Sequence, residues 1–263
     1  MKTSIATVSV SGNLREKLEA IAAAGFSAIE IFEQDFIAYD GKPRDVGRMV
    51  HDYGALSIVD GVGFAPHGFP DLKDLDADIY LFSLYKTYGP HLGMMHVKEE
   101  LIQKMSNQSH FFKKGQAHSM LTPAGPDHAQ IASVSGIFDY FDELYAHHFV
   151  DNPNPVTKLA KLNALIRDHE AKLMTPLLDF LSSRDDVQLL GPADVKDRLP
   201  IVSFIPKKGV SEVYSKLVDQ KIMLGKGHFY ALRPLIDMNI DIDPGVIRIS
   251  FLHYTGMKEI DQL

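Results

Sequence analysis

The sequence predicts an α/β protein that opens with a parallel sheet and closes with a smaller α+β part. Three patterns support this fold class. Strand-like and helix-like segments alternate through the first 54 residues, and a continuous apolar strand follows at 55–60. A long amphipathic helix at 156–181 then precedes three short β-rich segments. Alternating strands and helices are typical of parallel sheets, because each helix returns the chain to the end of the sheet where the previous strand began.

The first four elements follow a βαβα order. Residues 3–10 are β-branched and apolar and predict a strand, and Asn13 is a good N-cap for the helix that follows it. A glycine ends this helix, and residues 27–36 predict a second strand. Pro43 then begins a helix that stops at Gly54.

The remaining elements divide into two parts. Residues 55–60 form an apolar run that ends in Asp60, which predicts a buried parallel strand. Residues 156–181 have the apolar spacing of a long helix, and the segments PIVSFIP, KIMLGKG and VIRISFLHY predict strands of a small domain. The polar, proline-containing stretch Asn152 to Pro155 marks the boundary between these parts. The predicted domains are therefore 1–54, 55–152 and 153–263.

Composition narrows the classes of partner. The formal net charge of −7 and a pI near 5.9 give no reason to expect nucleic acid or an anionic membrane surface. No apolar run approaches the roughly 20 residues that cross a bilayer, and the N-terminus does not continue as a signal peptide, so a cytoplasmic location is expected. The chain has no cysteine, which excludes disulfides, thiolate metal sites and a cysteine nucleophile.

The opening segment resembles one enzyme family. The stretches IATVSVSG, KLEAIAAAGF and AIEIFEQDF are similar to the start of bacterial 3-dehydroshikimate dehydratases of the sugar-phosphate isomerase/epimerase barrel type, over about 54 residues. That resemblance implies a divalent metal held by ligands from later barrel strands. Those strands have no counterpart here, so Glu30 and Glu33 are expected to be surface residues and no metal site is predicted.

The rest of the chain resembles a different family. The stretches ALSIVDGVGFAPH, DADIYLFSLYKTYGPHLGMMHV and GVIRISFLHYTGMKEIDQL are similar to the class V aminotransferase superfamily, nearest to its cysteine-desulfurase-like branch, over about 209 residues. The resemblance implies the truncated large domain of a PLP (pyridoxal 5'-phosphate) fold type I enzyme with its small C-terminal domain, and a homodimer. The join at Gly54 without a linker suggests a chimera.

The same resemblance implies a set of site residues. Lys86, in an S-x-x-K motif, would bind PLP covalently, and Ser83 would donate a hydrogen bond to its phosphate. Asp60 would hold a proton on the pyridine nitrogen. His67 would contact a cofactor oxygen. Arg248 would bind the carboxylate of an amino acid substrate. From the residues alone, Asp60 could equally cap a turn, and Lys86 and Arg248 could be exposed surface residues.

The sequence also departs from this family. Gly63 stands where many relatives have a glutamine, and His228, Phe229 and Tyr230 stand in the loop where desulfurases carry their sulfur-accepting cysteine. The first hypothesis is a PLP-dependent lyase or aminotransferase acting on an amino acid, impaired because the first half of such an enzyme is replaced. The second is a catalytically silent scaffold, and the third is a dehydratase or sugar isomerase of barrel type.

Overall fold

The chain folds into two compact units in a computed structural model that describes residues 3–32, 35, 38–123 and 125–263. The first unit holds most of the chain up to Leu162, and the second holds Asn163–Leu263 together with the short segment Val8–Ser11. Within the described residues, no helix has the length and apolar character needed to cross a membrane.

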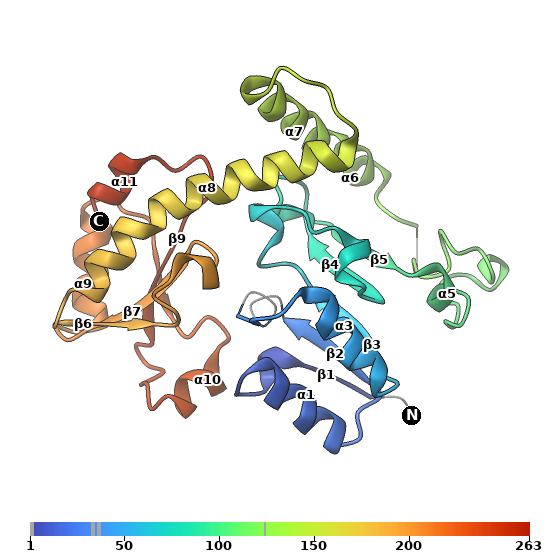
Figure 1. The fold of residues 1–263 in the computed structure, drawn as a ribbon, viewed down its shortest axis with the longest axis horizontal. Coiled ribbons are helices and arrows are strands. Elements are labelled where there is room, and N and C mark those ends of the chain that lie inside the picture. The colour runs from blue at the N-terminus through green and yellow to red at the C-terminus, as the bar shows by residue number, and fades with distance from the viewer. Residues whose placement is uncertain (1–2, 33–34, 36–37, 124) are drawn as a thin grey trace. The chain divides into compact units, whose positions relative to one another are not determined.

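The first unit is built on a five-stranded sheet in which the strands follow one another in chain order (Figure 1). The first four strands pair in parallel, and the fifth is antiparallel at the edge. This sheet confirms the predicted α/β class. Its strands are β1 (Ser4–Ala6), β2 (Ala28–Phe32), β3 (Leu56–Asp60), β4 (Ile79–Ser83) and β5 (Gly93–Val97). Its helices are α1 (Leu14–Ala23), α3 (Pro43–Asp52), α4 (Leu72–Leu75), α5 (Glu99–Ile102), α6 (His128–Ser133) and α7 (Ser135–His148).

The first strand is shorter than the sequence predicts. A 3₁₀ turn at Thr7–Ser9 follows β1 directly, whereas the apolar pattern predicts extended chain as far as residue 10. Thr7 is completely buried, and its Oγ1 accepts a hydrogen bond from the backbone N–H of Phe32 at 2.8 Å. The Thr7 hydroxyl thus takes the place of a backbone carbonyl in the hydrogen bonding between β1 and β2, as threonine hydroxyls can.

Helix α1 begins where the sequence predicts. The Asn13 side chain accepts a hydrogen bond from the backbone of Glu16 at 3.1 Å, and the Glu16 carboxylate accepts one from the Asn13 backbone at 2.8 Å. This reciprocal capping satisfies two of the donors that every helix start leaves free. Helix α3 ends just before Gly54, whose φ of +69° suits a glycine.

A partly buried ionic cluster joins the end of α3 to the sheet. Asp78, directly before β4, accepts a hydrogen bond from the backbone of Ser57 at 2.8 Å and contacts His51 Nε2 at 2.9 Å through its Oδ2. Its Oδ1 lies 3.2 Å from Lys98 Nζ, and the same amine lies 2.9 Å from Asp76. His51 belongs to the opening segment and its partners to the following one, so the cluster connects the two parts of the sequence.

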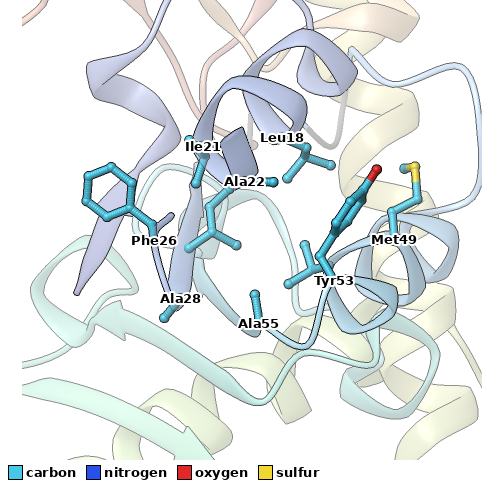
Figure 2. Close-up of a pocket in the computed structure, with 10 residues that line it drawn as sticks. Leu18, Ile21, Ala22, Phe26, Ala28, Met49, Tyr53 and Ala55 are labelled. Carbon is cyan, nitrogen blue, oxygen red and sulfur yellow. The ribbon is translucent and has the colours of Figure 1, made fainter. Parts of the chain in front are cut away.

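A pocket of about 110 Å³ lies between α1 and α3 (Figure 2). Leu18, Ile21 and Ala22 of α1 line it together with Met49 of α3 and Tyr53. Its floor is formed by the beginning of β2 and the residue before β3. Parallel α/β sheets bind ligands at the opposite, carboxyl ends of their strands, so we treat this pocket as a packing defect and not as a binding site.

The second unit contains a four-stranded antiparallel sheet in the order β6, β7, β9, β8. The long helix α8 (Pro155–Ser182) runs from the first unit into the second, within one residue of the predicted bounds at each end. Leu173, Met174, Val202 and Ile247 form the centre of the core between this helix and the sheet. The strands are β6 (Val187–Leu190), β7 (Ile201–Pro206), β8 (Gly225–Gly227) and β9 (Val246–Ser250), and the helices are α9 (Val210–Asp219), α10 (Leu232–Asp237) and α11 (Met257–Asp261).

Candidate functional site

Strands β3 and β4 bring Asp60 and Ser83 to the same edge of the sheet, the one formed by the carboxyl ends of the parallel strands. The two strands are parallel neighbours, and Asp60 is paired with Leu81, two residues before Ser83. The backbone N–H of Gly61 donates to the Leu81 carbonyl at 2.8 Å and fixes this register at the point where both strands end. Carboxyl ends of parallel strands are where α/β proteins place ligands, so these two side chains occupy a favourable position for binding.

The Asp60 carboxylate is half-buried and already serves one structural purpose. Its Oδ1 accepts a hydrogen bond from the backbone of Val62 at 2.9 Å, so the turn-capping role holds for one oxygen. The next position admits only glycine, because a Cβ on Gly61 would overlap the Tyr80 hydroxyl. At Gly63, by contrast, a Cβ would point into open space. The region around Asp60 is therefore tightly packed on one side and open on the other.

Lys86 follows β4 in a 3₁₀ turn that two buried residues hold in place. Leu84 is buried at 2% exposure, and its backbone N–H donates to Leu92 at 2.9 Å. Thr87 is completely buried, and its hydroxyl donates to the Ser83 carbonyl at 3.3 Å. Lys86 itself is exposed. Exposure is usual for lysine, and the anchored backbone fixes the position from which the Lys86 amine extends.

The two histidines near this turn lie in different environments. His67 is only 3% exposed, within the 3₁₀ helix Ala65–His67. Such burial favours a role in packing over contact with a ligand, and its predicted role in cofactor binding stays a prediction. His91 stacks on the ring of Tyr85, with centroids 4.8 Å apart and planes 13° apart. Because Tyr85 directly precedes Lys86, His91 is the imidazole that lies beside the lysine turn.

Glu30 lies close to Asp60, a relation that the sequence analysis did not predict. On the parallel pair β2 and β3, Glu30 faces Ile58, two residues before Asp60, so both carboxyl groups project from the same face of the sheet. Burial raises the pKa of Glu30, and the negative charge of Asp60 raises it further. Glu33, considered together with Glu30 in the sequence, lies outside the described residues.

The beginning of α1 is a poor place for a phosphate group. A helix N-terminus after a glycine turn can bind anions through its free N–H groups. Here the Glu16 carboxylate already accepts from the Asn13 backbone, and the Asn13 side chain accepts from the Glu16 N–H. A Cβ on Gly12 would lie 2.9 Å from Glu16 Oε2, so the carboxylate also fills the space over the turn.

Arg248 belongs to the second unit, on β9 between β7 and β8. It pairs with Ser203 on one side and Gly225 on the other. Its guanidinium carbon lies 3.9 Å from the centre of the Phe229 ring, and burial lowers the pKa of Arg248. Among the described residues, its Nε is buried and has no hydrogen-bond partner. Asp60, Ser83 and Lys86 thus gather in the first unit, whereas Arg248 lies in the second.

The side chains at the strand edge suit PLP. They provide a carboxylate for a protonated ring nitrogen, a hydroxyl for a phosphate and an amine for a covalent bond. Among the residues that the structure describes, no three histidine or acidic side chains lie where they could hold a metal ion.

Comparison with known proteins agrees with the two resemblances. An aminotransferase-like protein of Gibberella zeae is 32% identical over 226 residues, which cover 84% of this chain and 53% of that protein. A 3-dehydroshikimate dehydratase of Pseudomonas aeruginosa is 67% identical over 54 residues, or 20% of this chain and 8% of that protein. The solved apo structure of a cysteine desulfurase from Thermococcus onnurineus matches with a TM-score of 0.73 at 18% identity, over 99% of this chain and 70% of that chain.

These matches differ in what they cover. The chain spans about half the length of the aminotransferase-like and cysteine desulfurase-like relatives. The likeness to the desulfurase structure includes the opening segment, so the dehydratase-like residues occupy strands of the same type of sheet. The family model for class V aminotransferases matches residues 42–121 and 159–263, which is more than half of the chain. The chain therefore belongs to the class V aminotransferase family.

Proposed function

We propose that the chain binds PLP at the edge formed by Asp60, Ser83 and Lys86 and acts on an amino acid. Class V aminotransferases and cysteine desulfurases are PLP-dependent. The observation that carries the proposal is the register of β3 and β4, which ends both strands at one edge with Lys86 on an anchored turn three residues further on.

Each residue has a chemical task in this proposal. PLP, when bound, supplies the electron sink that weakens bonds at the α-carbon of an amino acid. Lys86 would bind the cofactor covalently and, once displaced by substrate, move a proton at that carbon. Asp60 would hold the proton on the ring nitrogen, and Ser83 would donate its hydroxyl hydrogen to the phosphate. Arg248 would bind the substrate carboxylate with two parallel hydrogen bonds.

The reaction is an elimination or a transamination and not the transfer of sulfur to the protein. A protein persulfide requires a cysteine thiolate, and the chain has none. Release of sulfide from cysteine by simple elimination remains compatible with the proposed residues, because that reaction needs only the cofactor and a proton-transferring amine.

We further propose that activity is low in this chain alone. Only Ser83 is assigned to the phosphate, and the start of α1 already carries the Glu16 carboxylate in place of an anion. A homodimer and a chimeric origin of the first 54 residues complete the proposal. The competing function is a silent scaffold that keeps the family fold without binding PLP.

Covalent labelling tests the site. Incubation with PLP followed by borohydride is expected to fix the cofactor on the peptide that contains Lys86, and the Lys86→Ala variant should lose the label. Lys114→Ala, which removes another exposed lysine of the first unit, should keep it. Labelling that persists in Lys86→Ala at the wild-type level contradicts the assignment, and no labelling in any variant favours the silent scaffold.

A further inference from the structure

The loop after β8 contains a backbone conformation that aromatic residues seldom adopt. The backbone N–H of Ala231 donates to the His228 carbonyl at 2.8 Å, which closes a four-residue turn. Both central residues have positive φ, +47° at Phe229 and +63° at Tyr230. Turns of this kind normally use glycine or asparagine there, because a side chain crowds the backbone in the left-handed region. Such strain persists only where the surroundings hold it, and it concentrates at functional sites.

The Phe229 ring explains how the strained turn is held. The ring lies 3.9 Å from the Arg248 guanidinium carbon. The ring also lies against Gly225, where a Cβ would come within 2.7 Å of its carbons, and it packs against the hydrophobic cluster of Leu190, Leu235, Ile240 and Val246. Gly225 and Arg248 are cross-strand partners on β8 and β9, so the ring covers a space that only a glycine at 225 leaves open.

The ring also places an aromatic face against the charge of Arg248. Among the described residues, the Nε of this guanidinium is buried and has no hydrogen-bond partner. An aromatic face attracts a cation placed over it, which compensates in part for desolvation. The guanidinium carbon lies over the ring, and the five N–H groups of a guanidinium lie in one plane and form a fixed fork. That fork matches the two oxygens of a planar carboxylate.

We propose that Phe229, presented by the turn His228–Ala231, is a positioning residue that holds the Arg248 fork ready for a carboxylate. The ligand class is a small compound with a free carboxylate, such as an amino acid. The inference rests on the proposed function only in giving Arg248 a carboxylate to bind. It adds the residue that orients the arginine and a use for the strained turn.

The test uses the full chain without cofactor. The Arg248 Nε–H signal of ¹⁵N-labelled protein is followed by NMR while propionate is added, with inorganic phosphate as a comparison anion. In the wild type we expect an upfield ring-current position for this signal and a saturable shift with propionate at lower concentration than with phosphate. Phe229→Leu should remove the ring-current displacement and raise the half-saturating propionate concentration about tenfold, whereas Phe229→Tyr should retain wild-type behaviour.

Tyr230→Leu is the matched control, since it makes a similar change in the same turn at a ring that is 99% exposed. It should leave the propionate titration unchanged. Equal half-saturation for Phe229→Leu and wild type, or no ring-current displacement in the wild type, overturns the proposal even if Phe229→Leu folds poorly. Neither result depends on Lys86, so labelling by PLP can succeed while this inference fails.

Discussion

Glu30 and Asp60 place two carboxyl groups on one face of the first sheet, on neighbouring strands and two residues apart in register. Burial raises the pKa of Glu30, and the negative charge of Asp60 raises it further. In a bound state, a protonated ring nitrogen beside Asp60 would bring positive charge to this pair. Without it, the second negative charge is a cost to the fold.

Glu30→Gln should therefore stabilise the protein at neutral pH. A raised folded-state pKa means that the stability contributed by this group is complete below its unfolded value and is lost as pH rises through the folded value. We expect a gain of less than about 1 kcal/mol at pH 7, since partial exposure screens the effect, and no gain near pH 3. Urea unfolding at both pH values measures it, with the exposed Glu19→Gln as control. A loss of stability at pH 7 contradicts the explanation.

The residues that the sequence could identify are those that a local motif carries. Asp60 at the end of an apolar strand and Lys86 three residues after Ser83 are visible within short windows, and the structure brings Asp60 and Ser83 to one edge. Glu30 and Phe229 were missed because their significance comes from pairing between strands. Side chains alternate between the two faces of a sheet, so the register of β2 and β3 is needed to place Glu30 beside Asp60. The sequence alone does not give that register.

At the scale of elements, helices α1 and α3 leave a pocket of about 110 Å³ between them. The pocket between them meets alanine at 22, 28 and 55, where the side chains are too small to fill the space. A similar void in a well-packed interior costs stability roughly in proportion to its volume, although an opening to solvent reduces the penalty.

Filling this pocket should stabilise the first unit. Ala22→Leu directs a larger apolar side chain into the pocket and keeps helix propensity close to that of alanine, so we expect a gain of about 1 kcal/mol in the free energy of unfolding. Ala23→Leu, on the exposed side of the same helix, should change stability by less than about 0.5 kcal/mol. Chemical denaturation of both variants measures the difference. Equal effects would show that the pocket is already filled in solution.

The ionic cluster behind α3 should dominate acid sensitivity. Burial raises the pKa of Asp78, but hydrogen bonds from Ser57, His51 and Lys98 outweigh it and hold the pKa below its usual value. A depressed pKa gives stability that is present above the unfolded value and lost as pH falls through the folded one. Asp78→Asn should cost roughly 2 kcal/mol above about pH 5, because it removes the charged acceptor that Ser57, His51 and Lys98 share, while Lys98 keeps Asp76 as a partner.

The difference between wild type and Asp78→Asn should then shrink as pH falls below about 4. Thermal unfolding of wild type and Asp78→Asn across this pH range measures the difference. The same measurement on Asp74→Asn, at an exposed aspartate, shows how much comes from general charge effects. A cost that stays constant down to pH 2 would show that the hydrogen-bond geometry of the aspartate matters and its charge does not.

For the whole molecule, the fold class followed from the sequence because strand and helix alternation is a local pattern with a global consequence. The function of the assembled chain does not follow in the same way. A segment of 54 residues is similar to a dehydratase, and residues 42–121 and 159–263 match class V aminotransferases, yet both parts contribute strands to one sheet. Fold is preserved by matching strands and helices, whereas catalysis needs side chains placed to within about an ångström.

The isolated chain should accordingly bind PLP weakly. We expect a dissociation constant of roughly 0.1 mM or weaker, near −5.5 kcal/mol, and negligible turnover with a panel of amino acids. Titration followed by visible absorption gives the affinity, and Lys86→Ala corrects for non-specific lysine adducts. Tight stoichiometric binding with substantial turnover would contradict this prediction. It would show that the opening segment supplies phosphate contacts in addition to Ser83.

The edge strand β5 has a consequence for how the protein behaves when concentrated. Met94 and Met95 are exposed at 39% and 48%, and residues Gly93–Val97 include neither a lysine nor a proline. Natural sheets often carry lysine or proline in their edge strands, because unpaired backbone groups at an edge can pair with a strand of another chain. The net charge of −7 opposes this approach only through long-range repulsion, which salt weakens. Solubility should therefore fall with ionic strength, through growth of sheets from molecule to molecule.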